Sequence, residues 1–386
     1  MACAPPAPTR SASRRCCRRC RASAIGCWGG WASTPAHSSA PTWWARYPRA
    51  DVYHLTSQNL ASLLLFRRPA GKVVVTVHDI IPYMLRADRQ LSVYRGAADR
   101  LFDRMAMAGL KRADRLIAVS HYSKRSVVAL LHIRADQIDV VHESVDHSRF
   151  RPLDVPAALR ERYSLPAGRR YLIYVGSDDP RKNLATLLRA LAELRQTQPD
   201  VELIKVGRAH FDAERARLRA LAAELGLAGA IHWLDDVPER DLPLLYGLAD
   251  LCVMPSLYEG FGFPVIEAMA CGTPVVAANA SSLPELLGDA GRLYEPRDVH
   301  ALAEAIGELL GPGARREQLR QRAAARSAIS CPQQRSRRRW RATRCFRLHR
   351  YYALYRVRLF RAPRGKTAHR RSISTMLPQA QSPAFA

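Results

Sequence analysis

No hydrophobic run in the 386-residue sequence approaches the roughly 18 apolar residues that suggest a membrane-spanning helix. The longest candidate, Leu60 to Phe66, is far too short. Residues 1–50 also lack the apolar segment of a secretory signal. The sequence therefore predicts a cytoplasmic protein, with peripheral association with the inner face of the membrane as a further expectation. Its length suits two domains of roughly 150 residues each.

Acidic residues are absent from both ends of the chain. Residues 1–50 carry eight Lys or Arg and residues 318–386 carry eighteen, whereas 51–317 holds 34 basic and all 34 acidic residues. The net charge of +26 and seven of the nine cysteines therefore belong to the ends. We hypothesise that both ends are aberrant, disordered segments from a GC-rich gene read out of frame. The alternatives are a transit peptide and a basic tail for nucleic acid or anionic lipid; no nucleic-acid partner is expected.

From Asp51 onward, short β-branched runs alternate with helical stretches, which is the rhythm of parallel sheets with crossover helices. The predicted fold class is α/β. The first series comprises the strands Val52–Leu55, Val73–Val77, Leu116–Val119 and Ile138–Val141 and the helix Tyr94–Lys111. The second comprises the strands Tyr171–Val175, Val201–Val206, Ala230–Leu234, Leu251–Met254, Pro274–Ala277 and Arg292–Tyr294 and the helices Asn183–Arg195, Asp212–Leu225, Glu239–Leu248, Pro264–Ala270 and Val299–Leu310.

A stretch with three prolines and mixed charges separates the two series, and we place a linker at residues 151–168. The predicted domains are 51–150 and 169–317, two Rossmann-like domains facing one another across a cleft. Open parallel sheets bind ligands beyond the carboxyl ends of their strands. Functional residues are therefore expected just after strands.

The loop after the strand Tyr171–Val175 reads Gly176-Ser-Asp-Asp-Pro-Arg-Lys-Asn183. Two adjacent cations at the start of a helix favour an anion, so the loop is a candidate diphosphate site. Neither the P-loop nor G-x-G-x-x-G is present. The alternative is a solvated turn in which Asn183 or Asp179 caps the helix.

The loop after Leu251–Met254 contains Glu259, two glycines that let a ligand approach the backbone, and then Glu267 within a small, apolar helix. A buried carboxylate is costly unless it is hydrogen-bonded, so Glu267 should have a partner. Hydrolytic dyads need carboxyl groups about 5 to 9.5 Å apart, whereas eight residues of helix rise about 12 Å. The spacing therefore favours binding roles over glycoside hydrolysis.

The run Glu259-Gly-Phe-Gly-Phe-Pro-Val-Ile-Glu267, continuing Ala-Met-Ala-Cys-Gly-Thr-Pro-Val-Val, resembles the E-x7-E signature of retaining GT-B glycosyltransferases, the fourth family especially. The resemblance covers about residues 51–310. It extends through Tyr174-Val-Gly-Ser-Asp-Asp-Pro-Arg-Lys-Asn183, Ala249-Asp-Leu-Cys-Val-Met-Pro-Ser256, Ser281-Ser-Leu-Pro-Glu-Leu-Leu-Gly-Asp-Ala290, Asp51-Val-Tyr-His54, Val77-His-Asp-Ile-Ile-Pro82 and Ala113-Asp-Arg-Leu-Ile-Ala-Val-Ser-His-Tyr-Ser123.

This resemblance implies that the carboxyl-terminal domain binds a nucleotide-sugar. Lys182 and Arg181 would hold the diphosphate, and Glu259 would lie beside the transferred sugar. Glu267 would bond the ribose hydroxyls, and His78 would face the sugar from the first domain; by itself, a His after a strand is more often structural. The implied catalytic residues are Glu259, His78 and Lys182, and the implied donor-binding residues are Gly176, Arg181, Lys182, Glu259, Gly260, Phe261, Gly262 and Glu267.

The family further implies front-face substitution with retention, in which the leaving phosphate takes the acceptor proton. Many sugar transferases of the other main fold hold a metal through Asp-x-Asp, which is absent from this chain, so a metal-independent enzyme without a cofactor is predicted. GDP-mannose is the favoured donor because the Pro-Arg-Lys-Asn form resembles mannosyltransferases. A glycan or lipid-linked molecule in polysaccharide biosynthesis is the expected acceptor.

Three departures from the family pattern limit this interpretation. The usual opening strand, glycine-rich loop and helix are not found in residues 1–50, so the first domain is predicted to be incomplete. The closing helices are not recognisable after about Arg326, and Ser177 stands where relatives often have Arg. The alternative hypothesis is a catalytically impaired remnant that only binds nucleotide-sugar.

Overall fold

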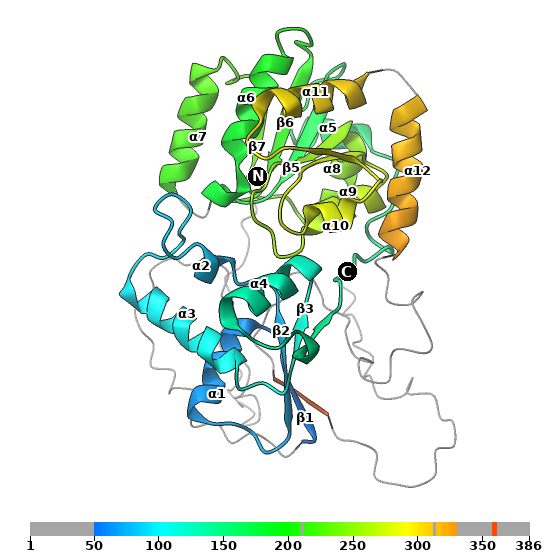
Figure 1. The fold of residues 1–386 in the computed structure, drawn as a ribbon. Coiled ribbons are helices and arrows are strands. Elements are labelled where there is room, and N and C mark those ends of the chain that lie inside the picture. The colour runs from blue at the N-terminus through cyan, green and yellow to red at the C-terminus, as the bar shows by residue number, and fades with distance from the viewer. Residues whose placement is uncertain (1–49, 210–211, 312–313, 330–356, 361–386) are drawn as a thin grey trace, which may run out of the picture. The chain divides into compact units, whose positions relative to one another are not determined.

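The computed structural model describes residues 50–209, 212–311, 314–329 and 357–360 (Figure 1). Every element described below belongs to one unit of the chain, which lies within Ser39–Ala386. The segment predicted to be aberrant at residues 1–50 lies outside the described residues except for its last residue, as does most of the predicted tail.

The first sheet contains four parallel strands that lie side by side in chain order. They are β1 (Val52–Leu55), β2 (Lys72–Val77), β3 (Arg115–Ala118) and β4 (Ile138–Val140). Each strand is confirmed to within one residue at either end. Their buried valines and leucines pack with the accompanying helices into one core cluster.

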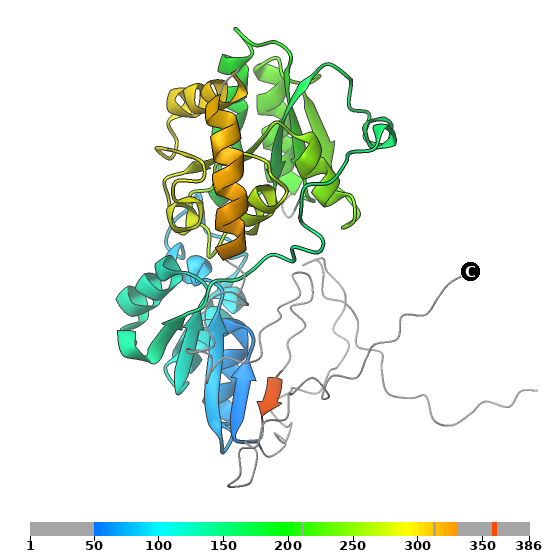
Figure 2. The ribbon, with the colours of Figure 1, turned by 90° about the vertical axis from the view of Figure 1, so that its right-hand side faces the viewer.

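A fifth strand, β11 (Val357–Phe360), pairs antiparallel with β1 at the edge of this sheet, as Figure 2 shows. It lies within residues 318–386, where the sequence predicts no regular structure. An open edge pairs through its backbone N–H and C=O groups, so the pairing needs no alternating apolar pattern that the sequence could reveal.

The predicted helix Tyr94–Lys111 is confirmed as α3 (Ala97–Leu110). The sequence analysis does not predict α4, because only two of its large apolar side chains, Val127 and Leu131, are buried among polar neighbours. The helices of this half of the chain are η2 (Gln58–Ser62), α1 (Leu63–Phe66), α2 (Ile81–Met84), α3, α4 (His121–Leu131) and η3 (Ala135–Gln137).

The second sheet is parallel throughout and has the order β10-β9-β8-β5-β6-β7. This is the 3-2-1-4-5-6 order of a doubly wound fold, with its reversal between β5 and β8. All six predicted strands are confirmed to within one residue. They are β5 (Arg170–Val175), β6 (Val201–Val206), β7 (Ile231–Leu234), β8 (Leu251–Met254), β9 (Val275–Ala278) and β10 (Arg292–Tyr294).

The helices of this half connect its strands (Figure 1). The helix predicted at Asn183–Arg195 is α6, and its five leucines at helical spacing are all buried. The leucine face of this helix is therefore part of the core. The helices are η4 (Pro180–Lys182), α6 (Leu184–Leu194), α7 (Asp212–Glu224), α8 (Leu242–Leu248), α9 (Phe263–Ala270), α10 (Leu283–Leu287) and α11 (Val299–Leu310).

Two segments outside the predicted second domain pack into its core. The predicted linker contains α5 (Ala157–Arg162), and its Leu159 and the following Leu165 are buried in that core. Beyond residue 317, α12 (Ala314–Ile329) lies against α9 and buries Leu319 and Ala323; Figure 2 shows it in orange. The apolar positions of both segments are few and lie among arginines and prolines, which gives a weak sequence signal. The core of the second domain therefore includes segments on both sides of the predicted bounds 169–317.

Among the described residues, no helix combines the length and the apolar composition needed to cross a membrane.

Candidate functional site

Two loops meet where the strand order of the second sheet reverses. One follows β5 and carries Arg181 and Lys182, and the other follows β8 and carries Glu259. The backbone N–H of Leu257 donates to the carbonyl of Arg181 at 2.9 Å. The side-chain amide of Asn183 donates to the carbonyl of Pro255 at 3.1 Å. These bonds join the two loops beyond the carboxyl ends of β5 and β8, which is the usual ligand position in such sheets.

An ion pair between Lys182 and Glu259 spans the two loops. The Nζ atom of Lys182 lies 2.5 Å from Oε1 of Glu259, and the two side chains are only 13% and 9% exposed. Burial raises the pKa of Glu259, but the charges of Lys182 and Arg181 outweigh it and bring the pKa below its ordinary value. Glu259 is therefore a carboxylate at neutral pH, held beside a cation.

Arg181 lies next to this pair and is shared among several acceptors. It donates to the carbonyl of Tyr258 at 3.0 Å, and its Nε atom lies 3.1 Å from a carboxylate oxygen of Asp179. Burial lowers the pKa of Arg181, but Glu259 and Asp179 raise it overall. Lys182 and Arg181, predicted together as a diphosphate site, thus lie together around Glu259.

The turn that presents these cations is fixed by its own side chains. Asp179 accepts a hydrogen bond from the backbone N–H of Arg181 and so caps the short helix η4, which precedes the helix α6 that it was predicted to cap. Asn183 has the left-handed conformation, with φ 57°, which Asn tolerates better than most residues. Its side chain makes the link to the β8 loop described above and no capping hydrogen bond to α6. The diphosphate-binding interpretation of this segment stays a prediction.

Glycines allow the close packing of the Glu259 loop. Gly262 has φ 112°, a conformation that disfavours a side chain. A Cβ atom on Gly260 would lie 2.2 Å from the carbonyl oxygen of His78. The hydroxyl of Ser282 donates to the carbonyls of Glu259 and Phe261, and Phe261 is buried. The backbone at Gly260, Phe261 and Gly262 is therefore held rigidly beside Glu259.

Glu267 lies within α9, and its side chain is fully buried. The hydroxyl of Tyr246 on α8 donates to its Oε2 atom at 3.0 Å. The expectation that this buried carboxylate has a hydrogen-bond partner is confirmed. Gly176, at the other end of the site, packs against Tyr174, whose hydroxyl would lie 2.7 Å from a Cβ atom there.

His78 follows β2 in the first sheet, and both of its ring nitrogens are engaged. Nε2 lies 2.9 Å from the carbonyl oxygen of Thr56, and Nδ1 lies 3.1 Å from a carboxylate oxygen of Glu143. Burial lowers the pKa of His78, but the hydrogen bond and charge of Glu143 raise it overall. The hydroxyl of Ser120, after β3, donates to the carbonyl of Gly260 at 2.7 Å, so the Glu259 loop also contacts the end of β3.

A buried charge cluster under the Lys182 loop was not predicted. The carboxylate of Asp178 is fully buried between Lys205, at 2.7 Å, and Arg215. Arg215 also pairs with Asp235 at 2.8 Å. Burial lowers the pKa of Lys205 despite the hydrogen bond with Asp178. Asp178 follows β5, Lys205 lies in β6, Arg215 lies on α7 and Asp235 follows β7. Only the fold brings these residues together.

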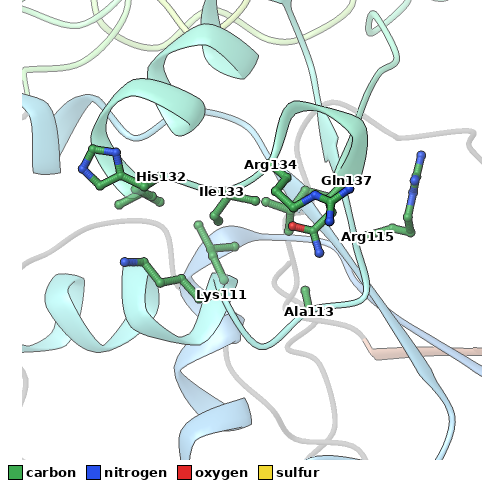
Figure 3. A pocket seen from close by; sticks show the side chains of 10 residues that line it. Lys111, Ala113, Arg115, His132, Ile133, Arg134 and Gln137 are labelled. Atoms are coloured by element: carbon green, nitrogen blue, oxygen red, sulfur yellow. The ribbon is translucent and has the colours of Figure 1, made fainter.

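A separate cavity of about 310 Å³ lies at the amino-terminal edge of β3 and β4 (Figure 3). Lys111, Arg115, His132 and Arg134 line it. Arg115 pairs with Asp139, and Arg134 pairs with Asp136. None of the predicted site residues lines this cavity, and its arginines already have counter-charges.

No group of three or more His, Cys, Asp or Glu side chains in the described part of the chain is arranged to hold a metal ion. Metal independence stays a prediction.

Comparison with known proteins identifies the family of this chain. Residues 157–326 match the family model Glycosyl transferases group 1, and residues 2–149 match the model Glycosyltransferase Family 4. The O-antigen chain mannosyltransferase B of Escherichia coli is 35% identical over 288 residues, which are 73% of this chain and 71% of that protein. The chain belongs to the glycosyl transferases group 1 family. The second match begins within the stretch predicted to be aberrant, and the reading-frame hypothesis stays a prediction.

Other similar proteins agree with this group 1 assignment. The D-inositol 3-phosphate glycosyltransferase of Acidothermus cellulolyticus is 38% identical over 216 residues, 54% of this chain and 48% of that protein. The chain thus spans about half of that relative. The structure of Anabaena HepE in complex with UDP and glucose has a TM-score of 0.60 and 26% identity, covering 72% of this chain and 73% of that one. This group 1 glycosyltransferase has the GT-B fold, as predicted.

Proposed function

We propose that this glycosyltransferase moves a hexose, with mannose favoured, from a nucleotide diphosphate sugar to a glycan or lipid-linked acceptor in polysaccharide biosynthesis. We propose further that transfer retains the anomeric configuration and needs no metal. The observation that carries the proposal is the Lys182–Glu259 ion pair where the strand order reverses. The pair offers a cation for phosphate and a carboxylate for sugar hydroxyls. The similarity to a mannosyltransferase supports GDP-mannose as donor.

The chemistry follows from where charge develops. The bond between the anomeric carbon and the diphosphate oxygen breaks while the acceptor oxygen bonds to the same carbon. Negative charge accumulates on the leaving phosphate, where Lys182 and Arg181 would donate, and one such donor is typically worth about 3 kcal/mol in the transition state. The leaving phosphate accepts the proton of the acceptor hydroxyl, so no protein nucleophile is required.

The ion pair changes partners when the donor binds. The diphosphate takes over Lys182 as its counter-charge, and Glu259 then accepts hydrogen bonds from the sugar hydroxyls. His78, oriented by Thr56 and Glu143, would position the sugar or the acceptor. The amides of Gly260, Phe261 and Gly262 would complete the sugar subsite.

Glu267 would bond the ribose hydroxyls, with Tyr246 fixing the orientation of its carboxylate. Gly176 would admit the phosphates to the backbone of the β5 loop, because a side chain there would crowd Tyr174. These assignments extend the family resemblance to residues at matching positions of this chain.

A lipid-linked acceptor would bring the enzyme to the membrane surface, and we include peripheral association in the proposal. Its support is a set of exposed large apolar side chains on α1 and α3, namely Phe66, Leu101 and Phe102. Arg100 and Arg104, which lie on α3 with Leu101 and Phe102, suit anionic headgroups.

A panel of nucleotide sugars tests the proposed function. The purified chain is incubated with GDP-mannose, UDP-glucose or UDP-N-acetylglucosamine, with and without EDTA, and its melting temperature and rate of donor hydrolysis are measured. We expect GDP-mannose to give the largest stabilisation and hydrolysis that EDTA does not change. Stabilisation by UDP sugars alone would overturn the donor assignment. Donor binding without hydrolysis or transfer would instead support the nucleotide-binding remnant.

A further inference from the structure

A second cavity of about 310 Å³ lies in the first half of the chain, outside the donor site. It is lined by Tyr83, Arg86, Ala87, Tyr94, Arg100 and Arg104. Three of its six lining residues are arginines and two are tyrosines. These side chains come from α2, from the connection that follows it and from the first half of α3.

Two of the three arginines in this cavity, Arg100 and Arg104, form no ion pair among the described residues, although they lie one turn apart on the same helix, where like charges repel. Asp103, on the same helix, accepts a hydrogen bond from the hydroxyl of Tyr94 and lies within electrostatic reach of Arg86. Arg86 lies over the ring of Tyr83, 4.2 Å from its centroid, and donates to the Tyr83 carbonyl at 2.7 Å. The cavity therefore holds two guanidinium groups without an ion-pair partner and a third whose charge Asp103 partly offsets.

The position of the cavity differs from that of the cavity in Figure 3. α2 begins four residues after β2 ends, in the same connection as His78, whereas α3 leads towards the start of β3. The cavity therefore lies towards the carboxyl-terminal edge of the first sheet, where α/β sheets bind ligands. The cavity of Figure 3 lies at the opposite edge, and its Arg115 and Arg134 are paired with aspartates.

We propose that the cavity formed by Arg86, Arg100 and Arg104 binds the phosphate or diphosphate group of the acceptor. Guanidinium groups bind phosphate through paired, charge-assisted hydrogen bonds, and the rings of Tyr83 and Tyr94 provide flat surfaces for the adjoining sugar. Leu101 and Phe102, 60% and 49% exposed, offer apolar surface on the same helix for an acceptor that carries a lipid. This inference rests on the proposed function, since it names the acceptor class of the same transferase.

The double variant Arg100→Gln/Arg104→Gln tests the proposal, and Arg115→Gln/Arg134→Gln is a control with the same charge change at the other cavity. Binding of mannose 6-phosphate and of mannose is measured by calorimetry in the Lys182→Met/Glu259→Gln background, which weakens the proposed donor-site anion subsite by removing one of its two cations. We expect mannose 6-phosphate to bind about 10- to 100-fold more weakly when Arg100 and Arg104 are changed, and not in the control. Equal binding in both variants, or equal binding of mannose and its phosphate, would overturn the proposal.

Transfer assays separate the two sources of phosphate and the two hypotheses. With a sugar phosphate and with a polyprenyl diphosphate-linked sugar as acceptors, the Arg100→Gln/Arg104→Gln variant should show a KM raised about 10- to 100-fold for the acceptor that the enzyme uses. Donor hydrolysis without acceptor should stay unchanged. If wild-type hydrolysis is itself absent, the proposed function fails while the binding measurement still decides the phosphate site. An unchanged KM for both phosphate acceptors would contradict the inference.

Discussion

The loops beyond the two sheets differ in how completely their charges are satisfied. After β5 and β8, cations and carboxylates are buried together, as in Lys182 with Glu259. After β2, His78 is 32% exposed, and Arg100 and Arg104 on α3 form no ion pair in the described structure. Under the proposed function, this difference corresponds to a preorganised nucleotide subsite beyond the second sheet and a more open acceptor subsite beyond the first.

The largest expected effect concerns the buried cluster below the donor loop. Asp178→Ala leaves Lys205 and Arg215 buried without their shared carboxylate, and breaking such a pair typically costs about 3 to 5 kcal/mol in the free energy of unfolding. The matched change Asp139→Ala removes an exposed partner of Arg115 beside the first sheet and should cost about 0 to 1 kcal/mol. Urea denaturation measures both. Similar losses in the two variants would erase the contrast between the regions.

The next effect concerns the Lys182–Glu259 pair itself. Lys182→Met should lower kcat by about 100- to 1000-fold, because one donor to the leaving phosphate is lost. It also leaves Glu259 buried without its cation, so the fold is less stable. The double variant Lys182→Met/Glu259→Gln removes both charges and should recover stability without recovering kcat. Recovery of kcat in the double variant would show that Lys182 serves structure alone.

The smallest expected effect concerns the His78–Glu143 pair beyond the first sheet. Glu143 raises the pKa of His78 in the folded state above the ordinary value of 6.5, so the protonated histidine stabilises the fold. This stability is fully present below the unfolded-state pKa and is lost as pH rises through the folded-state pKa. Glu143→Gln should therefore destabilise the protein most on the acid side of pH 6.5, with the difference fading at higher pH. A pH-independent difference in melting temperature would refute the pairing.

Much of the fold could be predicted because the strands of each half have recognisable local sequence patterns. The ten predicted strands are short β-branched runs bounded by polar turns, and their bounds are confirmed to within one residue. The loops carrying Lys182 and Glu259 could be identified because they directly follow such strands. Their direct contact depends on the order of β5 and β8 in the sheet, which no local pattern encodes.

The remaining site features depend on contacts between distant segments. Asp178, Lys205 and Arg215 come from three separate elements, and each alone resembles an ordinary surface charge. Tyr246 precedes Glu267 by 21 residues, and nothing in its local sequence identifies it as the partner of that carboxylate. The helix α12 was not predicted for a different reason: Leu319 and Ala323, which are buried, stand among arginines and glutamines that hide the helical period.

The counter-charge already present at Lys182 has a consequence for ligand discrimination. Under the proposed function, an isolated phosphate would have to separate Lys182 from Glu259 and would leave that carboxylate without a counter-charge, so its net binding energy would be small. A sugar nucleotide would replace both partners at once, with its diphosphate on the lysine and its sugar hydroxyls on the glutamate. After transfer the sugar hydroxyls would depart, Glu259 would pair with Lys182 again, and the nucleotide product would bind more weakly. One contact between two side chains thereby favours loading of the charged donor and discharge of the by-product.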